Sequence, residues 1–346
     1  MRLFGGSYTK MITQDFGGHG EGLYSLNFDP ENGAIKIIDT CFIENPSYVT
    51  ITNNILYTFN EVSLGEAPYL YAFRINEDGT FGLINKVAIN GSYPCHITHS
   101  PEYDMIFVSC YGSGNVLLYS LNPDGSVGHE LQKIQHHGKS KNPLRQDAPH
   151  VHYVGIDGTS GDVFVADLGI DKILMYAPQK ASTLPLANKG CIQIPEGSGP
   201  RHFVWLADNR FLMVLTELTA EVFVIDLSSR KIIGTLKLPM DDSGLVPGAA
   251  AIKISGDGRF IYISERATNK IFILKFDDSK KVVQLVGEVS ARVITPRDFL
   301  LDLTGNWLIV AGQESNSLSL FKRDIQTGTI EHYKTLGGFK SISCLI

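Results

Sequence analysis

The chain has 346 residues, of which 43% are hydrophobic and 19% are charged, and its formal net charge is −6. The apolar fraction is ample for a large core, and the negative charge argues against a nucleic-acid or membrane-binding surface, since either needs a basic stripe. No apolar run approaches the ~18 residues that a membrane-spanning helix needs. The five cysteines are scattered without a Cys-x-x-Cys pair, which is typical of reduced thiols, so we expect a cytoplasmic protein.

The first predicted elements are three strands at residues 3–8, 22–28 and 35–42. After them a proline recurs about every 50 residues, the period of a repeat architecture. Each of these prolines precedes an apolar strand, and they are Pro46, Pro94, Pro149, Pro200, Pro247 and Pro296.

The unit that starts at Pro247 shows the repeat plainly. Its predicted strands are 250–254, 260–264 and 270–276, and an Asp-Gly hairpin at 255–259 joins the first two. Short strands with Asp-Gly turns are all-β signals, and four short strands at this period are typical of propeller blades.

The two ends of the chain each supply part of one further unit. The three N-terminal strands lack a proline-led first strand, and the predicted strand 340–346 lacks a blade. Joining them would complete a seventh blade and remove the exposed sheet edge. We therefore predict a single all-β domain over 1–346, a seven-bladed β-propeller with four-stranded antiparallel blades. A pair of β-sandwiches is the alternative, and the even period disfavours it.

Unusual polar residues cluster at two places in the repeat. In antiparallel strands the start of the first and the end of the second emerge on one face, so these residues should converge on an axial funnel. Directly after the prolines stand Cys95, His150, Arg201 and Arg297, and two residues later, on the same side by period-two alternation, stand Ile97, His152, Phe203 and Phe299. The position between them carries His96 and His202, and the second strands end in Glu61, Tyr111, Asp167, Glu217, Glu265 with Arg266, and Gln313.

The longest interruption of the repeat, 128–148, should overhang the same face. Its cationic residues are His136, His137, Lys139, Lys141 and Arg145, and we expect the two histidines to be solvated. An acidic protein that gathers cations at one mouth suggests an anionic ligand, held by guanidinium forks and lysine charge.

Several segments, in order along nearly the whole chain, resemble the seven-bladed lactonase family. They include Asn45-Pro46-Ser47-Tyr48, Pro149-His150-Val151-His152, Gly199-Pro200-Arg201-His202 and Thr295-Pro296-Arg297-Asp298-Phe299. That family includes bacterial propeller-type 6-phosphogluconolactonases and fungal carboxy-muconate lactonizing enzymes. The resemblance implies a catalytic pocket with a histidine, a glutamate and two arginines, which match His150 or His152, Glu217, Arg201 and Arg266. Arg266 departs from the pattern because it follows Glu265, whose carboxylate would partly offset it.

The resemblance favours hydrolysis of a phosphorylated sugar δ-lactone. His150 or His152 would take a proton from water, and Glu217 would orient the imidazole or relay the proton. Arg201 and Arg266 would hold the phosphate or polarise the carbonyl. The other residues predicted to bind substrate are His96, Tyr111, Arg145 and Arg297, and for Arg297 a structural ion pair with Asp298 is the competing interpretation.

Two other functions stay open, a muconate-type cycloisomerase and a non-catalytic interaction scaffold. We expect no cofactor and no metal, because arginines around the histidines disfavour a dication. The predicted partner is a small anionic sugar lactone, with no nucleic acid and no membrane, and we expect a monomer or a weak homo-oligomer.

Overall fold

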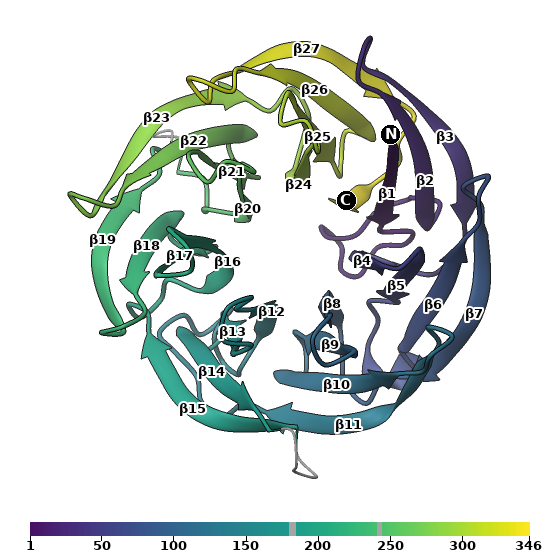
Figure 1. Cartoon of the computed structure of the whole chain (residues 1–346), viewed down its shortest axis with the longest axis horizontal. Helices are drawn as coiled ribbons and strands as arrows, with labels where there is room; N and C mark the ends of the chain where they lie inside the picture. The colour runs from purple at the N-terminus through teal and green to yellow at the C-terminus, as the bar shows by residue number, and fades with distance from the viewer. Residues whose placement is uncertain (180–184, 241–243) are drawn as a thin grey trace.

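The computed structural model describes residues 1–179, 185–240 and 244–346. Seven four-stranded antiparallel sheets stand around a central axis like the blades of a propeller (Figure 1). The predicted seven-bladed all-β architecture is confirmed. Within these ranges the helical structure is one 3-10 turn, η1 (Leu64–Glu66), and no helix is long and apolar enough to cross a membrane.

The blades are described in the order of their second strands along the chain, and the strands of each blade are given from the innermost to the outermost. The first four are β28 (Ile342–Leu345), β1 (Arg2–Ser7), β2 (Leu23–Asp29) and β3 (Ala34–Cys41); β4 (Val49–Thr52), β5 (Ile55–Phe59), β6 (Tyr69–Ile75) and β7 (Phe81–Ala88); β8 (Pro94–Ser100), β9 (Met105–Cys110), β10 (Asn115–Leu121) and β11 (Val127–Gln135); and β12 (Val151–Ile156), β13 (Val163–Asp167), β14 (Lys172–Pro178) and β15 (Leu186–Gln193).

The remaining three blades complete the ring. They are β16 (Pro200–Leu206), β17 (Phe211–Thr216), β18 (Glu221–Asp226) and β19 (Lys231–Lys237); β20 (Ala249–Ile254), β21 (Ile261–Glu265), β22 (Lys270–Asp277) and β23 (Val282–Ser290); and β24 (Pro296–Leu301), β25 (Trp307–Gly312), β26 (Ser317–Arg323) and β27 (Ile330–Gly337).

The ring closes through the two ends of the chain, as predicted. Strand β28 pairs with β1, with Gly5 opposite Leu345, and the two termini lie beside each other in Figure 1. Phe4 and Ile346 exchange two backbone hydrogen bonds of 2.9 Å. The closure satisfies backbone groups that would otherwise form an open sheet edge.

The core lies between the blades. The second strands β17 and β25 are buried at every residue, since neighbouring blades cover both of their faces. Met213 of β17 and Ile263 of β21, for example, belong to one apolar cluster that spans two blades. This packing explains why the second strands are continuous apolar runs, whereas the outer strand β27 exposes most of its residues.

A β-bulge interrupts six of the seven inner strands next to their first residue. The register to the second strand shifts between Pro94 and His96, for instance, and the residues in these bulges are Cys95, His152, Arg201, Ala250 with Ala251, Arg297 and Ser343. A bulge re-aims side chains and breaks the alternation of a strand. The expectation that Phe203 and Phe299 share the side of Arg201 and Arg297 is therefore wrong, because both phenylalanines lie in clusters between blades.

Candidate active site

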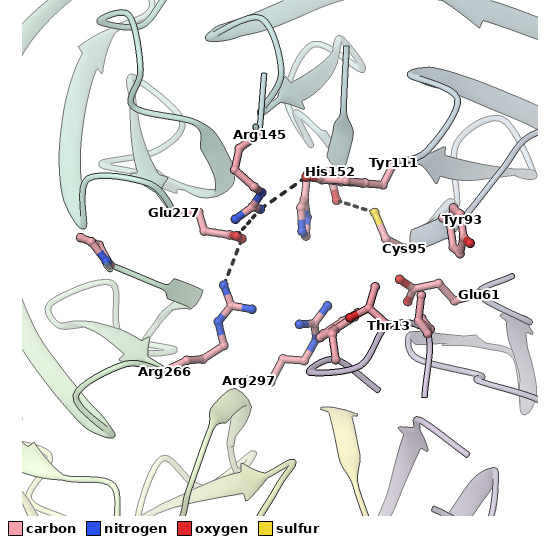
Figure 2. Close-up of a pocket in the computed structure, with 13 residues that line it drawn as sticks. Thr13, Glu61, Tyr93, Cys95, Tyr111, Arg145, His152, Glu217, Arg266 and Arg297 are labelled. Atoms are coloured by element: carbon pink, nitrogen blue, oxygen red, sulfur yellow. Dashed lines mark hydrogen bonds and ion pairs between the residues drawn. The ribbon is translucent and has the colours of Figure 1, made fainter. Parts of the chain in front are cut away.

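A cavity of about 630 Å³ occupies one mouth of the axial channel (Figure 2). Its volume is in the range of small-molecule sites. All seven blades or their connections contribute to it, through Ile12, Thr13, Phe16, Glu61, Tyr93, Cys95, Tyr111, Arg145, His152, Glu217, Pro247, Arg266 and Arg297.

One backbone hydrogen bond, repeated in every blade, sets the first ring of side chains around this mouth. In six blades the residue that follows the second strand donates its N–H to the carbonyl of the residue that precedes the inner strand, as Glu217 does to Gly199 at 2.8 Å. In the second blade the donor is Glu61, two residues after β5, and the acceptor is Asn45, four residues before β4. The seven donors are Tyr8, Glu61, Tyr111, Leu168, Glu217, Arg266 and Gln313. Four of them line the cavity, so the predicted convergence of the second-strand ends is present in the structure.

The bulged residues form a second ring below the first. A narrow continuation of the cavity, about 10 Å³, is lined by the bulged Cys95, His152, Arg201, Arg297 and Ser343, together with Ser47, Tyr48, His202 and Asp298. Cys95, His152 and Arg297 also line the main cavity, so they lie at its floor. Arg201 reaches only the narrow part.

Glu217 gathers three arginines on one wall. Its Oε1 lies 2.7 Å from Nη2 of Arg145, and its Oε2 lies 2.9 Å from Nε of Arg201 and 3.2 Å from Nη2 of Arg266. Burial by itself would raise the pKa of the Glu217 carboxyl, but Arg266, Arg201 and Arg145 outweigh burial and hold it well below its usual range. Glu217 is therefore an ionised anchor for guanidinium groups (Figure 2). The structure describes no hydrogen bond from it to His150 or His152.

His152 lines the floor of the cavity, and one of its ring nitrogens is buried without a partner among the described residues. The residue is 5% exposed, and this nitrogen is Nδ1. Burial and the nearby Arg201 lower the pKa of His152 well below its usual value. The imidazole is thus neutral at pH 7, with a ring nitrogen able to accept a hydrogen bond.

His150 lies outside the lining of the cavity. Its ring stacks on that of Tyr111 at 4.4 Å, and its Nδ1 is 3.0 Å from the Tyr111 carbonyl oxygen. Strand β12 begins at Val151, two residues after Pro149, whereas β16 begins at Pro200 itself. The counterpart of Arg201 is therefore His152, and the proline spacing had aligned it with His150.

Arg297 has no carboxylate partner within the described residues. Its Nη2 donates a 2.9 Å hydrogen bond to the Tyr8 hydroxyl, and its guanidinium lies 5.2 Å and 5.0 Å from the ring centroids of Tyr8 and Phe16. Asp298 instead lies 2.9 Å from Nζ of Lys253. The predicted Arg297–Asp298 pair is wrong because the bulge separates the two side chains.

The loop after β11 contributes Arg145 alone to the cavity lining. Arg145 also donates to the Tyr111 hydroxyl at 3.3 Å, while Lys139 and Lys141 are exposed outside the lining. The first part of the segment 128–148 was misassigned, because 128–135 belong to β11. His136 is buried rather than solvated, with its Nδ1 2.7 Å from Asp167.

His96 and Arg266 occupy different surroundings from those expected. His96 is buried below the main cavity against the rings of Tyr48 and Tyr153, and burial together with Arg201 lowers its pKa to about 3. Arg266 lines the cavity and donates from Nε to the Gly248 carbonyl at 2.8 Å. The carboxylate of Glu265 accepts from backbone N–H groups of Gly248 and Thr268, so it faces away from the Glu217 cluster.

Sequence reasoning missed part of the wall and the role of one carboxylate. The connection between β1 and β2 contributes Ile12, Thr13 and Phe16 to the wall. The predicted strand order already places this connection on the face of the site, so its unusual length in the amino-acid sequence could have indicated that it lines the cavity. Glu61 accepts hydrogen bonds at Oε2 from the Tyr8 hydroxyl (2.8 Å) and from the Ser47 hydroxyl. Burial raises its pKa, against the opposing effects of Arg297 and of these hydrogen bonds.

A known family with this architecture, described as lactonase, 7-bladed beta-propeller, matches residues 2–345. The chain belongs to this lactonase family. The resemblance of its motifs is thereby confirmed, and membership supports a lactone-hydrolysing enzyme.

Two of the similar proteins carry lactonase names. The chain is 30% identical over 334 residues to the 6-phosphogluconolactonase of Bacillus subtilis strain 168, covering 94% of this chain and 92% of that protein. The periplasmic gluconolactonase PpgL of Pseudomonas aeruginosa superposes with a TM-score of 0.91 at 27% identity, covering 100% of this chain and 98% of that one. A Lactobacillus plantarum protein at 24% identity and TM-score 0.89, covering 99% and 98%, shares the fold. The cytoplasmic location of this lactonase-family chain stays a prediction.

Proposed function

We propose that this lactonase-family protein hydrolyses the δ-lactone of a small phosphorylated sugar acid, 6-phosphogluconolactone or a close relative. The observation that carries the proposal is the unpartnered Nδ1 of His152, which shares one cavity with Arg145, Arg266 and Arg297. A neutral base and several guanidinium groups are what the hydrolysis of an anionic ester requires.

The charge of the cavity suits an anionic substrate. Three arginines line the cavity and Arg201 adjoins it, together with two carboxyl groups, that of Glu217 with a lowered pKa and that of Glu61 with a raised pKa. Glu217 anchors Arg145, Arg201 and Arg266, and the Tyr8 hydroxyl anchors Arg297. These guanidinium forks are therefore held in place before a substrate arrives, which lowers the cost of binding a phosphate or stabilising an oxyanion.

The arginines lie at different depths in the cavity, and these depths indicate how the substrate would be oriented. The Arg145 side chain is 42% exposed and belongs to the rim, where it would bind the phosphate together with Arg266. Arg297 and His152 share the floor, where the lactone carbonyl would lie. His152 takes a proton from water, the oxygen attacks the carbonyl carbon, and Arg297 faces the developing oxyanion.

The bound substrate would also tune the base. Burial and, after it, the positive charge of Arg201 lower the pKa of His152, and a phosphate dianion in the cavity would offset the effect of Arg201. The pKa of His152 then rises toward the reaction pH, where a general base contributes about 10²–10⁴-fold.

One assay tests this function. Acid release from freshly prepared 6-phosphogluconolactone is followed above its spontaneous rate, in parallel with unphosphorylated gluconolactone and with a carboxy-muconate. We expect hydrolysis of both lactones, with kcat/KM for the phosphorylated one higher by about tenfold or more, because one charged hydrogen bond contributes about 1.5–3 kcal/mol. Equal rates on the two lactones would contradict the phosphate assignment. Turnover of the muconate alone would support the cycloisomerase, and inertness toward all three would support the scaffold.

A further inference from the structure

Glu61 and Glu217 occupy equivalent positions in blades on opposite sides of the cavity. Glu217 directly follows β17 and Glu61 lies two residues after β5, and each makes the backbone hydrogen bond that recurs around the ring, from Glu61 to Asn45 at 2.9 Å and from Glu217 to Gly199 at 2.8 Å. Both side chains are almost fully buried and both line the cavity. Figure 2 shows the two carboxylates on facing walls. The fold thus places a pair of carboxyl groups around one substrate site.

The partners of the two carboxyl groups differ in charge. Glu217 contacts three arginines, whereas the described hydrogen bonds to Glu61 come from two neutral hydroxyls, those of Tyr8 and Ser47. Arg297, the cation that lowers the pKa of Glu61 most, donates to the Tyr8 hydroxyl. An ionised Glu61 would therefore lack direct neutralisation by a cation, which is costly for a buried charge.

The hydrogen bonds also decide where a proton on Glu61 would lie. The Tyr8 oxygen accepts from Arg297, so its own proton points to Oε2 of Glu61, and the Ser47 hydroxyl donates to the same Oε2. No hydrogen bond within the described ranges reaches Oε1. A proton on Glu61 therefore lies on Oε1 and is free to be donated into the cavity.

We propose that Glu61 is the catalytic general acid, which donates its proton to the ring oxygen as the lactone opens. This inference rests on the proposed function. It divides the acid and base tasks between two cavity residues, Glu61 and His152, and leaves Glu217 to anchor the arginines. Burial raises the pKa of Glu61 while arginines hold that of Glu217 low, and such a separation of two carboxyls is typical of acid–base sites.

The proton balance closes over one turnover. His152 takes one proton from the attacking water, and the tetrahedral intermediate collapses with cleavage of the bond between the carbonyl carbon and the ring oxygen. Glu61 gives its proton to that oxygen, which becomes the product hydroxyl. The new carboxylic acid releases its proton to solvent, and protonated His152 returns its proton to Glu61 through solvent.

The direct test compares Glu61→Gln with the wild type and with Glu331→Gln, an exposed control on β27. Glutamine keeps the size of the side chain and its acceptor oxygen but cannot donate the carboxyl proton. We expect kcat on the phosphorylated lactone to fall by about 10²-fold, with a smaller change in KM, and the alkaline limb of the pH–rate profile to disappear. Glu331→Gln should match the wild type.

A second variant covers the case in which Glu61→Gln fails to fold. The Ser47 hydrogen bond lowers the pKa of Glu61, so Ser47→Ala should raise that pKa and move the alkaline limb to higher pH. A wild-type kcat in Glu61→Gln would overturn the role of Glu61 as the general acid. An alkaline limb at the wild-type pH in Ser47→Ala would overturn it too, and neither result would affect the proposed function. A wild-type protein inert toward lactones would instead overturn the proposed function.

Discussion

Oε2 of Glu217 lies 2.9 Å from Nε of Arg201, and both side chains are at most 7% exposed. The same carboxylate also contacts Arg145 and Arg266, so one negative charge holds three cations at the substrate cavity. Of the three arginines, Arg201 depends most on the Glu217 carboxylate to stay charged, because burial and the nearby Arg297 lower the pKa of its guanidinium to about 10. The cluster therefore couples the stability of the fold to the geometry of the site.

Glu217→Gln removes this counterion and leaves buried guanidinium groups uncompensated. Loss of one partner of a buried ion pair costs about 3–5 kcal/mol, so the free energy of unfolding should fall by that order and KM for the phosphorylated lactone should rise. Urea denaturation and steady-state kinetics measure the two effects. Glu221→Gln, in the adjacent strand β18 of the same blade, is the control, and equal stability of the two variants would contradict the anchoring role.

His152→Asn and His150→Asn separate the two candidate bases. His152 lines the floor of the cavity, whereas His150 stacks outside it on Tyr111. We expect kcat to fall by about 10²–10⁴-fold for His152→Asn and much less for His150→Asn. Single-turnover measurements of lactone hydrolysis would check this, and the reverse order of the two variants would reassign the base.

Arg297→Lys and Arg145→Ala test the orientation of the substrate. If Arg297 faces the oxyanion, lysine keeps the charge but loses the fork, and kcat should fall by about 10²-fold, the usual cost of removing an oxyanion donor. Arg145→Ala should mainly raise KM, because the arginine at the rim binds the phosphate in both ground and transition states. Arg292→Lys, exposed near Arg297 in sequence, should change neither constant. A KM effect for Arg297 and a kcat effect for Arg145 would invert the orientation.

The stability of the protein should fall in acid because of its buried histidines. Unfolded histidine binds a proton below about pH 6.5, whereas folded His96 does so only near pH 3. The unfolded state thus binds more protons in this window, and stability is lost as pH drops from 6.5 toward 3, by about 1.4 kcal/mol per pH unit per such histidine. His152 and His202, whose pKa values burial also lowers, add to the effect. Urea denaturation across this range should give a shallower pH dependence for His96→Phe, and an unchanged slope would refute the assignment.

The ring of seven blades was predictable from the amino-acid sequence because its causes are local and repeated. Prolines before apolar strands, Asp-Gly hairpins and buried second strands recur at one period, and the incomplete units at the two ends point to closure through β1 and β28. The ends of the second strands were also predictable as site positions. Glu217, Arg266 and Tyr111 follow from the antiparallel order of strands alone.

The direction in which the side chains of the inner strands point could be determined only from the three-dimensional structure. Bulges place Arg201, Arg297 and His152 on the axis, and a bulge breaks the alternation of a strand at a point that the amino-acid sequence alone did not reveal. The amino-acid sequence left His150 and His152 as alternatives, and the structure places His152 in the lining of the cavity, because β12 begins two residues after Pro149. The opposite protonation tendencies of Glu61 and Glu217 also arise only after folding, since the arginines that surround one of them come from distant parts of the chain.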